Sequence, residues 1–136
     1  MSTKTKSIVT TVARVIFGLI YLVFGLNFFF NFLPAQPQPE GAAGAYVGGL
    51  FQSGYFFPLL KGIEVIAGAL LLAGFFVPLS VAVLAPISLH IFLFHTILVP
   101  EGAPIGILVL VLNLFLAWAY RANFKPLFQG KAGVSL

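Results

Sequence analysis

A lysine and a glutamate, Lys61 and Glu64, stand three residues apart inside a long apolar stretch of this chain. On a helix this spacing places both side chains on one face, where they can form an ion pair that makes either charge less costly to hold in an apolar medium. The pair is either a structural device, with Lys61 extending to the membrane surface, or part of a ligand site. Glu64 is the stronger indication of a site, because its side chain is too short to extend to the surface.

Other polar side chains interrupt the apolar stretches at similar depths. At ~1.5 Å per residue from the outer end of each stretch, Asn27 and Glu64 lie ~9 Å deep, and His90 and Asn113 lie ~13 Å deep. Lys61 lies closer to the surface. Four stretches thus each contribute a polar group to one level, which predicts a ligand pocket that opens outward. Its predicted residues are Asn27, Lys61, Glu64, His90 and Asn113.

The two histidines, His90 and His95, do not indicate haem. Five residues apart on one helix, they point ~140° away from each other and cannot both ligate one iron. A metal site would have few ligands, so we predict none. The sequence contains 0 cysteines, which excludes thiolate ligation of iron–sulfur clusters. Quinone remains a possible cofactor.

Four apolar stretches must position these groups, at about 8–33, 55–77, 78–99 and 104–121. Each is about long enough to cross the ~30 Å hydrocarbon core of a bilayer. With 60% hydrophobic and 7% charged residues, a chain this small could not hide its apolar surface from water. We therefore predict an integral membrane protein whose residues 1–136 form a single transmembrane domain. Only helices satisfy the backbone in four such spans, so the predicted fold is an all-α, up-down-up-down four-helix bundle.

The basic residues predict the orientation. Lysines precede the first stretch and basic residues follow the last, whereas two glutamates lie in connections on the other side: Lys4, Lys6, Arg121, Lys125, Lys131, Glu40 and Glu101. This is the positive-inside pattern, and it predicts an inner-membrane protein of bacteria with both termini in the cytoplasm. The net charge of +4 therefore reflects topology, and we predict no nucleic-acid partner.

Prolines mark the predicted helix boundaries. Pro34 and Pro126 are expected to close the first and last spans, and Pro86 is expected to kink the third. After Pro34 comes a stiff, proline-rich segment and then Gly41–Gly54, which is too short and too rich in glycine to span a bilayer. We predict a short interfacial helix there.

The first span has two polar or small-residue faces that cannot both point into a four-helix core. Asn27 and Asn31 share one face, and Arg14, Gly18, Tyr21 and Gly25 share the other. Either the glycine face packs on a second copy of the chain, or the asparagine face meets the connecting segment. The first alternative would make the protein a homo-oligomer.

Several sequence segments resemble the DoxX family of membrane proteins. They are Phe17–Asn27, Gly54–Leu59 and Glu64–Leu72, together with Tyr120-Arg121 and Phe124-Lys125-Pro126 near the end of the chain. The resemblance implies a role in membrane redox chemistry, since relatives resemble the small subunit of thiosulfate:quinone oxidoreductase and others are linked to detoxification of oxidants. The glutamate of the family's second helix matches Glu64. Family members often carry a lysine where this chain has Asn27-Phe28.

These observations lead to one main functional hypothesis and two alternatives. The main hypothesis is a subunit that binds a small ligand such as a quinone beside a redox partner protein; without cysteines or a haem-ligand pair it is not a self-sufficient redox enzyme. The first alternative is a small proton-coupled transporter that uses Glu64. The second is a structural membrane partner whose polar groups only fix helix packing.

Overall fold

The computed structural model describes residues 2–136, and these residues form helices and loops without any strand. The elements in chain order are α1 (Thr3–Phe30), α2 (Gly41–Gln52), α3 (Phe56–Ala73), α4 (Val77–Leu93), the π-helix η1 (Phe94–Leu98), the 3₁₀-helix η2 (Pro100–Gly102), α5 (Ala103–Ala119), α6 (Arg121–Phe124) and the 3₁₀-helix η3 (Lys125–Phe128). The predicted all-α fold is confirmed.

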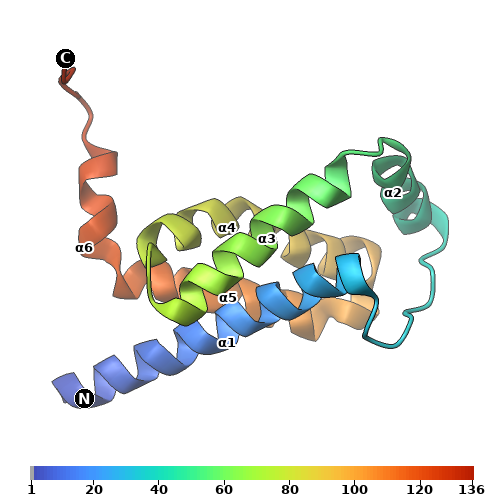
Figure 1. Cartoon of the computed structure of the whole chain (residues 1–136), viewed down its shortest axis with the longest axis horizontal. Helices are drawn as coiled ribbons and strands as arrows, with labels where there is room; N and C mark the ends of the chain where they lie inside the picture. Colours follow the sequence, from blue (N-terminus) through green and yellow to red (C-terminus); the bar gives the residue numbers. More distant parts are fainter. Residues whose placement is uncertain (1) are drawn as a thin grey trace.

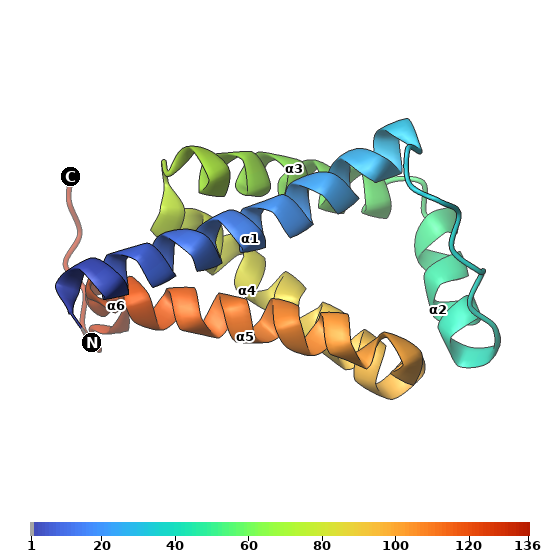
Figure 2. The ribbon, with the colours of Figure 1, turned by 90° about the horizontal axis from the view of Figure 1, so that it is seen from below.

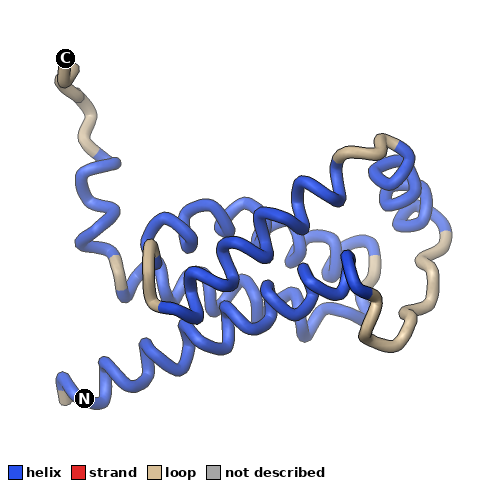
Figure 3. The backbone as a smooth tube through the Cα atoms, viewed as in Figure 1, coloured by secondary structure: helices blue, strands red, loops and turns tan. Residues whose placement is uncertain are grey.

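Four helices are long and apolar enough to cross a membrane: Thr3–Phe30, Phe56–Ala73, Val77–Leu98 and Pro100–Ala119. They run lengthwise beside one another, and the tube in Figure 3 shows the alternating direction of the chain through them. Both termini lie at one end of the bundle and α2 lies at the other (Figure 1). The chain is therefore an up-down-up-down bundle and a multi-pass membrane protein.

Close packing of α1 on α3 decides which face of α1 points inward. A Cβ atom added to Gly68 would lie 2.7 Å from the backbone nitrogen of Leu22 and 2.8 Å from the carbonyl oxygen of Gly18. Gly25 is similarly close to Val65. Small residues of this kind allow two helix backbones to approach within a bilayer. The glycine face of α1 is thus occupied by α3 of the same chain, so it does not serve a second copy.

The core between the helices is narrow, as expected when the surrounding medium is apolar. Fully buried side chains include Phe17, Tyr21, Leu71, Leu84 and Leu116, and the rings of Phe17 and Tyr21 pack edge to face with centroids 5.2 Å apart. Many other large apolar side chains point outward. In lipid this outward apolar surface is favourable, because acyl chains solvate it as well as a protein core would.

Helix ends differ from those predicted at three places. α1 ends at Phe30 because Asn31 adopts a left-handed conformation (φ 50°) as its C-cap, so Pro34 follows the end and does not cause it. α3 ends at Ala73, before Gly74 (φ 79°). α5 ends at Ala119, and Pro126 lies inside η3 rather than closing the last span.

Arg14 supports the end of α3 from the neighbouring helix. Its guanidinium donates to the carbonyl oxygens of Leu71 and Leu72, the latter at 3.3 Å. These carbonyls belong to the last turn of α3, where the regular helical N–H partners run out, and among residues 2–136 the Leu71 carbonyl otherwise accepts only from the N–H of Gly74 at 3.3 Å. A cation at a helix C-terminus is also favoured by the helix dipole. Arg14 therefore has a structural role beyond the interfacial anchoring that its position alone indicates.

The predicted short helix in the long connection is present as α2. It runs across the end of the bundle, as Figure 2 shows. Ala43 is its buried residue, and Tyr46, Val47 and Leu50 lie toward α3 and the π-helical end of the third span. α2 therefore covers this end of the bundle.

Candidate functional site

A cavity of about 420 Å³ lies among α2, α3, α4 and η1. We call it the polar cavity because its wall includes Lys61, Glu64, His90, His95 and the hydroxyl-bearing Tyr46. The rest of the wall is apolar or aromatic, including Val47, Leu50, Phe57, Leu60, Ile87 and Phe94. A largely apolar wall with a few placed polar groups is typical of small-molecule sites.

The ion pair expected from the sequence is present at the wall of this cavity. Lys61 Nζ lies 2.9 Å from Glu64 Oε2, and the side chain of Glu64 is 3% exposed against 22% for Lys61. The contact is an ion pair without good hydrogen-bond alignment, so Oε2 has no hydrogen-bond partner among residues 2–136. The Lys61 ammonium still compensates the charge of this buried carboxylate. The ion pair forms a charged part of the cavity wall.

His90 is held in place by α2. Its Nε2 shares a hydrogen bond of 3.0 Å with the hydroxyl of Tyr46 in α2, and the two rings stack with centroids 5.6 Å apart. Tyr46 also lies against Phe94, at 6.2 Å between centroids. These contacts join α2 to the third span and fix the orientation of the imidazole at the cavity.

His95 lines the same cavity as His90, although regular helical geometry predicts that the two diverge. The helix changes to a π-helix at Phe94, where the N–H of Val99 bonds to the carbonyl of Phe94 five residues back. His95 also packs against the next connection, since a Cβ atom added at Gly102 would lie 2.6 Å from its ring.

Asn27 does not line the polar cavity. Its Oδ1 accepts a hydrogen bond of 2.8 Å from the backbone N–H of Leu33. Asn27 thereby ties the end of α1 to the start of the connecting segment. Of the two alternatives for the first span, the structure selects the contact between the asparagine face and the connection.

Asn113 is also outside the polar cavity. Its amide donates to Ser88 Oγ at 3.1 Å, and Ser88 shares a hydrogen bond of 2.7 Å with the hydroxyl of Tyr21. All three side chains are at most 2% exposed. They link α5, α4 and α1, and we call them the buried triad. Depth alone placed Asn113 beside Glu64, but its helix rotation points it to a different part of the core.

The model of the DoxX family matches residues 9–96. The chain belongs to the DoxX family. The match includes α1, α2, α3 and most of the third span, so it covers every residue that lines the polar cavity. α5 and the segments after it lie beyond the match. No curated protein and no solved structure matches this DoxX chain.

Within this DoxX chain, the polar cavity combines one anion, one cation, two imidazoles and a phenol in an aromatic setting. Lys61 can only donate hydrogen bonds and ionised Glu64 can only accept them, whereas each histidine can do both. The cavity can therefore hold a ring with oxygen atoms that accept or donate. The sequence prediction missed Tyr46 and His95; a tyrosine among the glycines and alanines of the short helix was the available signal for the first.

Proposed function

We propose that the polar cavity binds the head group of a quinone, and that the chain serves as a ligand-binding subunit of a membrane redox complex. The observation that carries the proposal is the Lys61–Glu64 ion pair beside His90 in the wall of a largely aromatic cavity. A few placed polar groups in an apolar wall are typical of a small-molecule site.

A quinone head group suits each part of the wall. Its flat ring can stack on aromatic side chains, which favour offset or tilted arrangements. Its carbonyl oxygens can accept hydrogen bonds from Lys61 and from an imidazole N–H. After reduction, a quinol hydroxyl can donate to Glu64 Oε2. The isoprenoid tail of such a molecule would extend into lipid.

We propose that the electrons come from a partner protein. The sequence has 0 cysteines, so the chain offers no thiolate ligands for an iron–sulfur cluster. Its own residues would bind and orient the quinone and move protons to it, and the partner would supply the redox centre. Oxidant detoxification is one setting in which such a complex would act.

The direct test is quinone binding by the purified chain and by Glu64→Gln. Decylubiquinone should raise the unfolding temperature of the unsubstituted protein in detergent, because a ligand that binds only the folded state stabilises it. Glu64→Gln keeps the shape of the side chain and removes its charge, and it should reduce the shift. Glu101→Gln, which alters an exposed glutamate of η2, should bind normally. Equal shifts in all three proteins would contradict the proposal.

A proton-coupled transporter is the second candidate, because it too would use a single buried carboxylate. It requires Glu64 to change its charge during each cycle, which the close ion pair with Lys61 opposes. Purified protein in liposomes should therefore show no solute flux driven by a pH gradient. Flux that Glu64→Gln abolishes would establish transport and displace the quinone proposal.

For the localisation we propose a bacterial inner membrane with both termini in the cytoplasm. The support is the placement of the basic residues at the terminal end of the bundle (Figure 1), which is the side that the positive-inside rule assigns to the cytoplasm. Cysteines introduced at Gln38 and Gly102 should react with an impermeant reagent added outside spheroplasts. Cysteines at Ser2 and Ser135 should not, and the reverse pattern would invert the orientation.

A further inference from the structure

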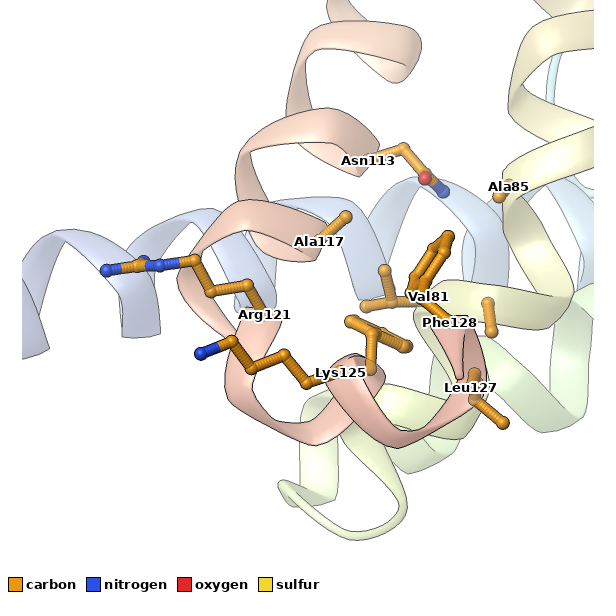
Figure 4. A pocket seen from close by; sticks show the side chains of 10 residues that line it. Val81, Ala85, Asn113, Ala117, Arg121, Lys125, Leu127 and Phe128 are labelled. Atoms are coloured by element: carbon orange, nitrogen blue, oxygen red, sulfur yellow. The ribbon is translucent and has the colours of Figure 1, made fainter. Parts of the chain in front are cut away.

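A second cavity, of about 600 Å³, lies at the terminal end of the bundle between α4, α5 and the short helices α6 and η3. We call it the basic cavity. Its floor and walls are apolar and include Ala85 on α4, Ala117 on α5 and Phe128 on η3. Figure 4 shows Asn113 at its inner end and two cations, Arg121 and Lys125, on one rim.

The two cations lie on the same side of the cavity. In Figure 4 their side chains extend in the same direction, away from Leu127 and Phe128, and both residues line the cavity. The guanidinium of Arg121 is held over the ring of Trp118 at 4.6 Å and donates to the carbonyl oxygen of Trp118 at 2.9 Å. Arginine has five N–H donors, so several remain for a ligand.

The positive charge at this end of the bundle favours an anionic ligand. Of the 7 lysines and arginines in the sequence, all except Lys61 lie toward the terminal end. The 3 acidic residues lie elsewhere: Glu64 is at the polar cavity, and Glu40 and Glu101 are in connections at the far end. Among residues 2–136, no aspartate or glutamate side chain lies at this end of the bundle to pair with Arg121 or Lys125. The positive charge at the rim of the basic cavity is therefore free to attract an anionic head group.

The apolar wall of the basic cavity fits a ligand that has an apolar tail. Asn113 and Arg121 are eight positions apart along the chain, so the apolar wall extends ~12 Å from the charged rim toward the middle of the bundle. Arg121 begins α6, with only Tyr120, the C-cap of α5, between the two helices, and the end of a membrane span is where bilayer head groups are expected. A phosphate at the rim would therefore place an acyl chain along the apolar wall.

We propose that the basic cavity is a binding site for an anionic glycerophospholipid. Its phosphate contacts Arg121 and Lys125, and one acyl chain occupies the groove between α4 and α5. Anionic lipids are concentrated where basic residues flank membrane spans, and basic pockets between spans bind their head groups. The site is separate from the polar cavity, so this proposal is independent of the quinone proposal.

The test measures the binding of dioleoyl phosphatidylglycerol to the purified full chain, by native mass spectrometry and by thermal unfolding in detergent. Dioleoyl phosphatidylcholine, which has no net charge, and oleate, a free fatty acid, are the comparison ligands. We expect phosphatidylglycerol to be retained and to raise the unfolding temperature, and the other two to have much smaller effects.

Three variants locate the site. Ala85→Phe places a ring in the cavity at an exposed position of the helix, so folding is preserved while lipid is excluded. Arg121→Gln combined with Lys125→Gln should weaken binding by about fivefold for each cation removed. Lys4→Gln combined with Lys6→Gln removes the same charge from the same end but away from the cavity, and it should bind as well as the unsubstituted chain.

Each contrary result overturns the proposal. An undiminished phosphatidylglycerol effect in Ala85→Phe would mean that lipid binds elsewhere. Equal losses in the two double variants would mean that general surface charge attracts the lipid. Preference for oleate would identify a fatty-acid site. If Ala85→Phe does not fold, the comparison of the two double variants decides between a site and surface charge alone.

Discussion

Two groups of polar side chains lie within the apolar bundle, and they differ in how completely their hydrogen bonds are satisfied. The buried triad of Tyr21, Ser88 and Asn113 links three helices through two hydrogen bonds of 2.7 and 3.1 Å. The Lys61–Glu64 pair, by contrast, is an ion contact of 2.9 Å in which Glu64 Oε2 has no aligned hydrogen bond among residues 2–136, and it borders a cavity. The difference indicates that the triad fixes helix packing, and it supports our proposal that the ion pair belongs to a ligand site.

The largest effect should come from Gly68→Val, which separates α1 from α3. The added atoms would overlap the backbone of Leu22 and Gly18, and we expect a loss of about 3 kcal/mol in unfolding free energy. Displacing α1 also breaks the triad, since Tyr21 is its member from that helix. The Lys61–Glu64 pair is local to α3 and should survive. Gly62→Val is the control, because nothing lies within 4 Å of that Cβ position.

Ser88→Ala should destabilise the protein by about 2 kcal/mol while leaving ligand binding unchanged. It leaves the hydroxyl of Tyr21 and the amide of Asn113 buried without their partner. Ser80→Ala is the matched control, because Ser80 is equally buried but its Oγ has no hydrogen bond to lose. Denaturation of both variants in detergent provides the measurement. Similar stabilities would remove the structural role that we assign to the triad.

Glu64→Gln should show the opposite behaviour. Quinone affinity is expected to fall about tenfold, equivalent to 1.4 kcal/mol, with little change in stability, since Lys61 is partly exposed and can extend to the membrane surface. Titration of decylubiquinone into each protein measures the affinity. A variant that loses stability and retains affinity would make the ion pair another packing device.

Tyr46→Phe should have the smallest effect. It removes the hydrogen bond to His90 and retains the ring stack, so quinone affinity should fall about threefold. Tyr55→Phe is the control, because Tyr55 is 67% exposed. If both substitutions act equally on affinity, α2 does not position His90 for the ligand.

The sequence was sufficient to predict the four spans, the short helix between the first two, and the pairing of Lys61 with Glu64. Hydrophobicity and residue spacing determine those features directly. It was insufficient for Asn27 and Asn113, because depth along a helix does not specify rotation about its axis. Close approach at Gly18 and Gly68 sets that rotation for α1, and this depends on how two helices fit together. The short π-helix Phe94–Leu98 was not predicted from the sequence either.

The short length of α3 links the polar cavity to the thickness of the host membrane. Its 18 residues correspond to ~27 Å along the axis, less than the ~30 Å hydrocarbon core of a typical bilayer. A short span causes the bilayer to thin around it, which brings head groups and water closer to Glu64. Lipids with shorter acyl chains would relieve this mismatch. Hydrophobic thickness thus becomes a variable that tunes hydration of the ion pair, and with it the quinone affinity that we propose for the cavity.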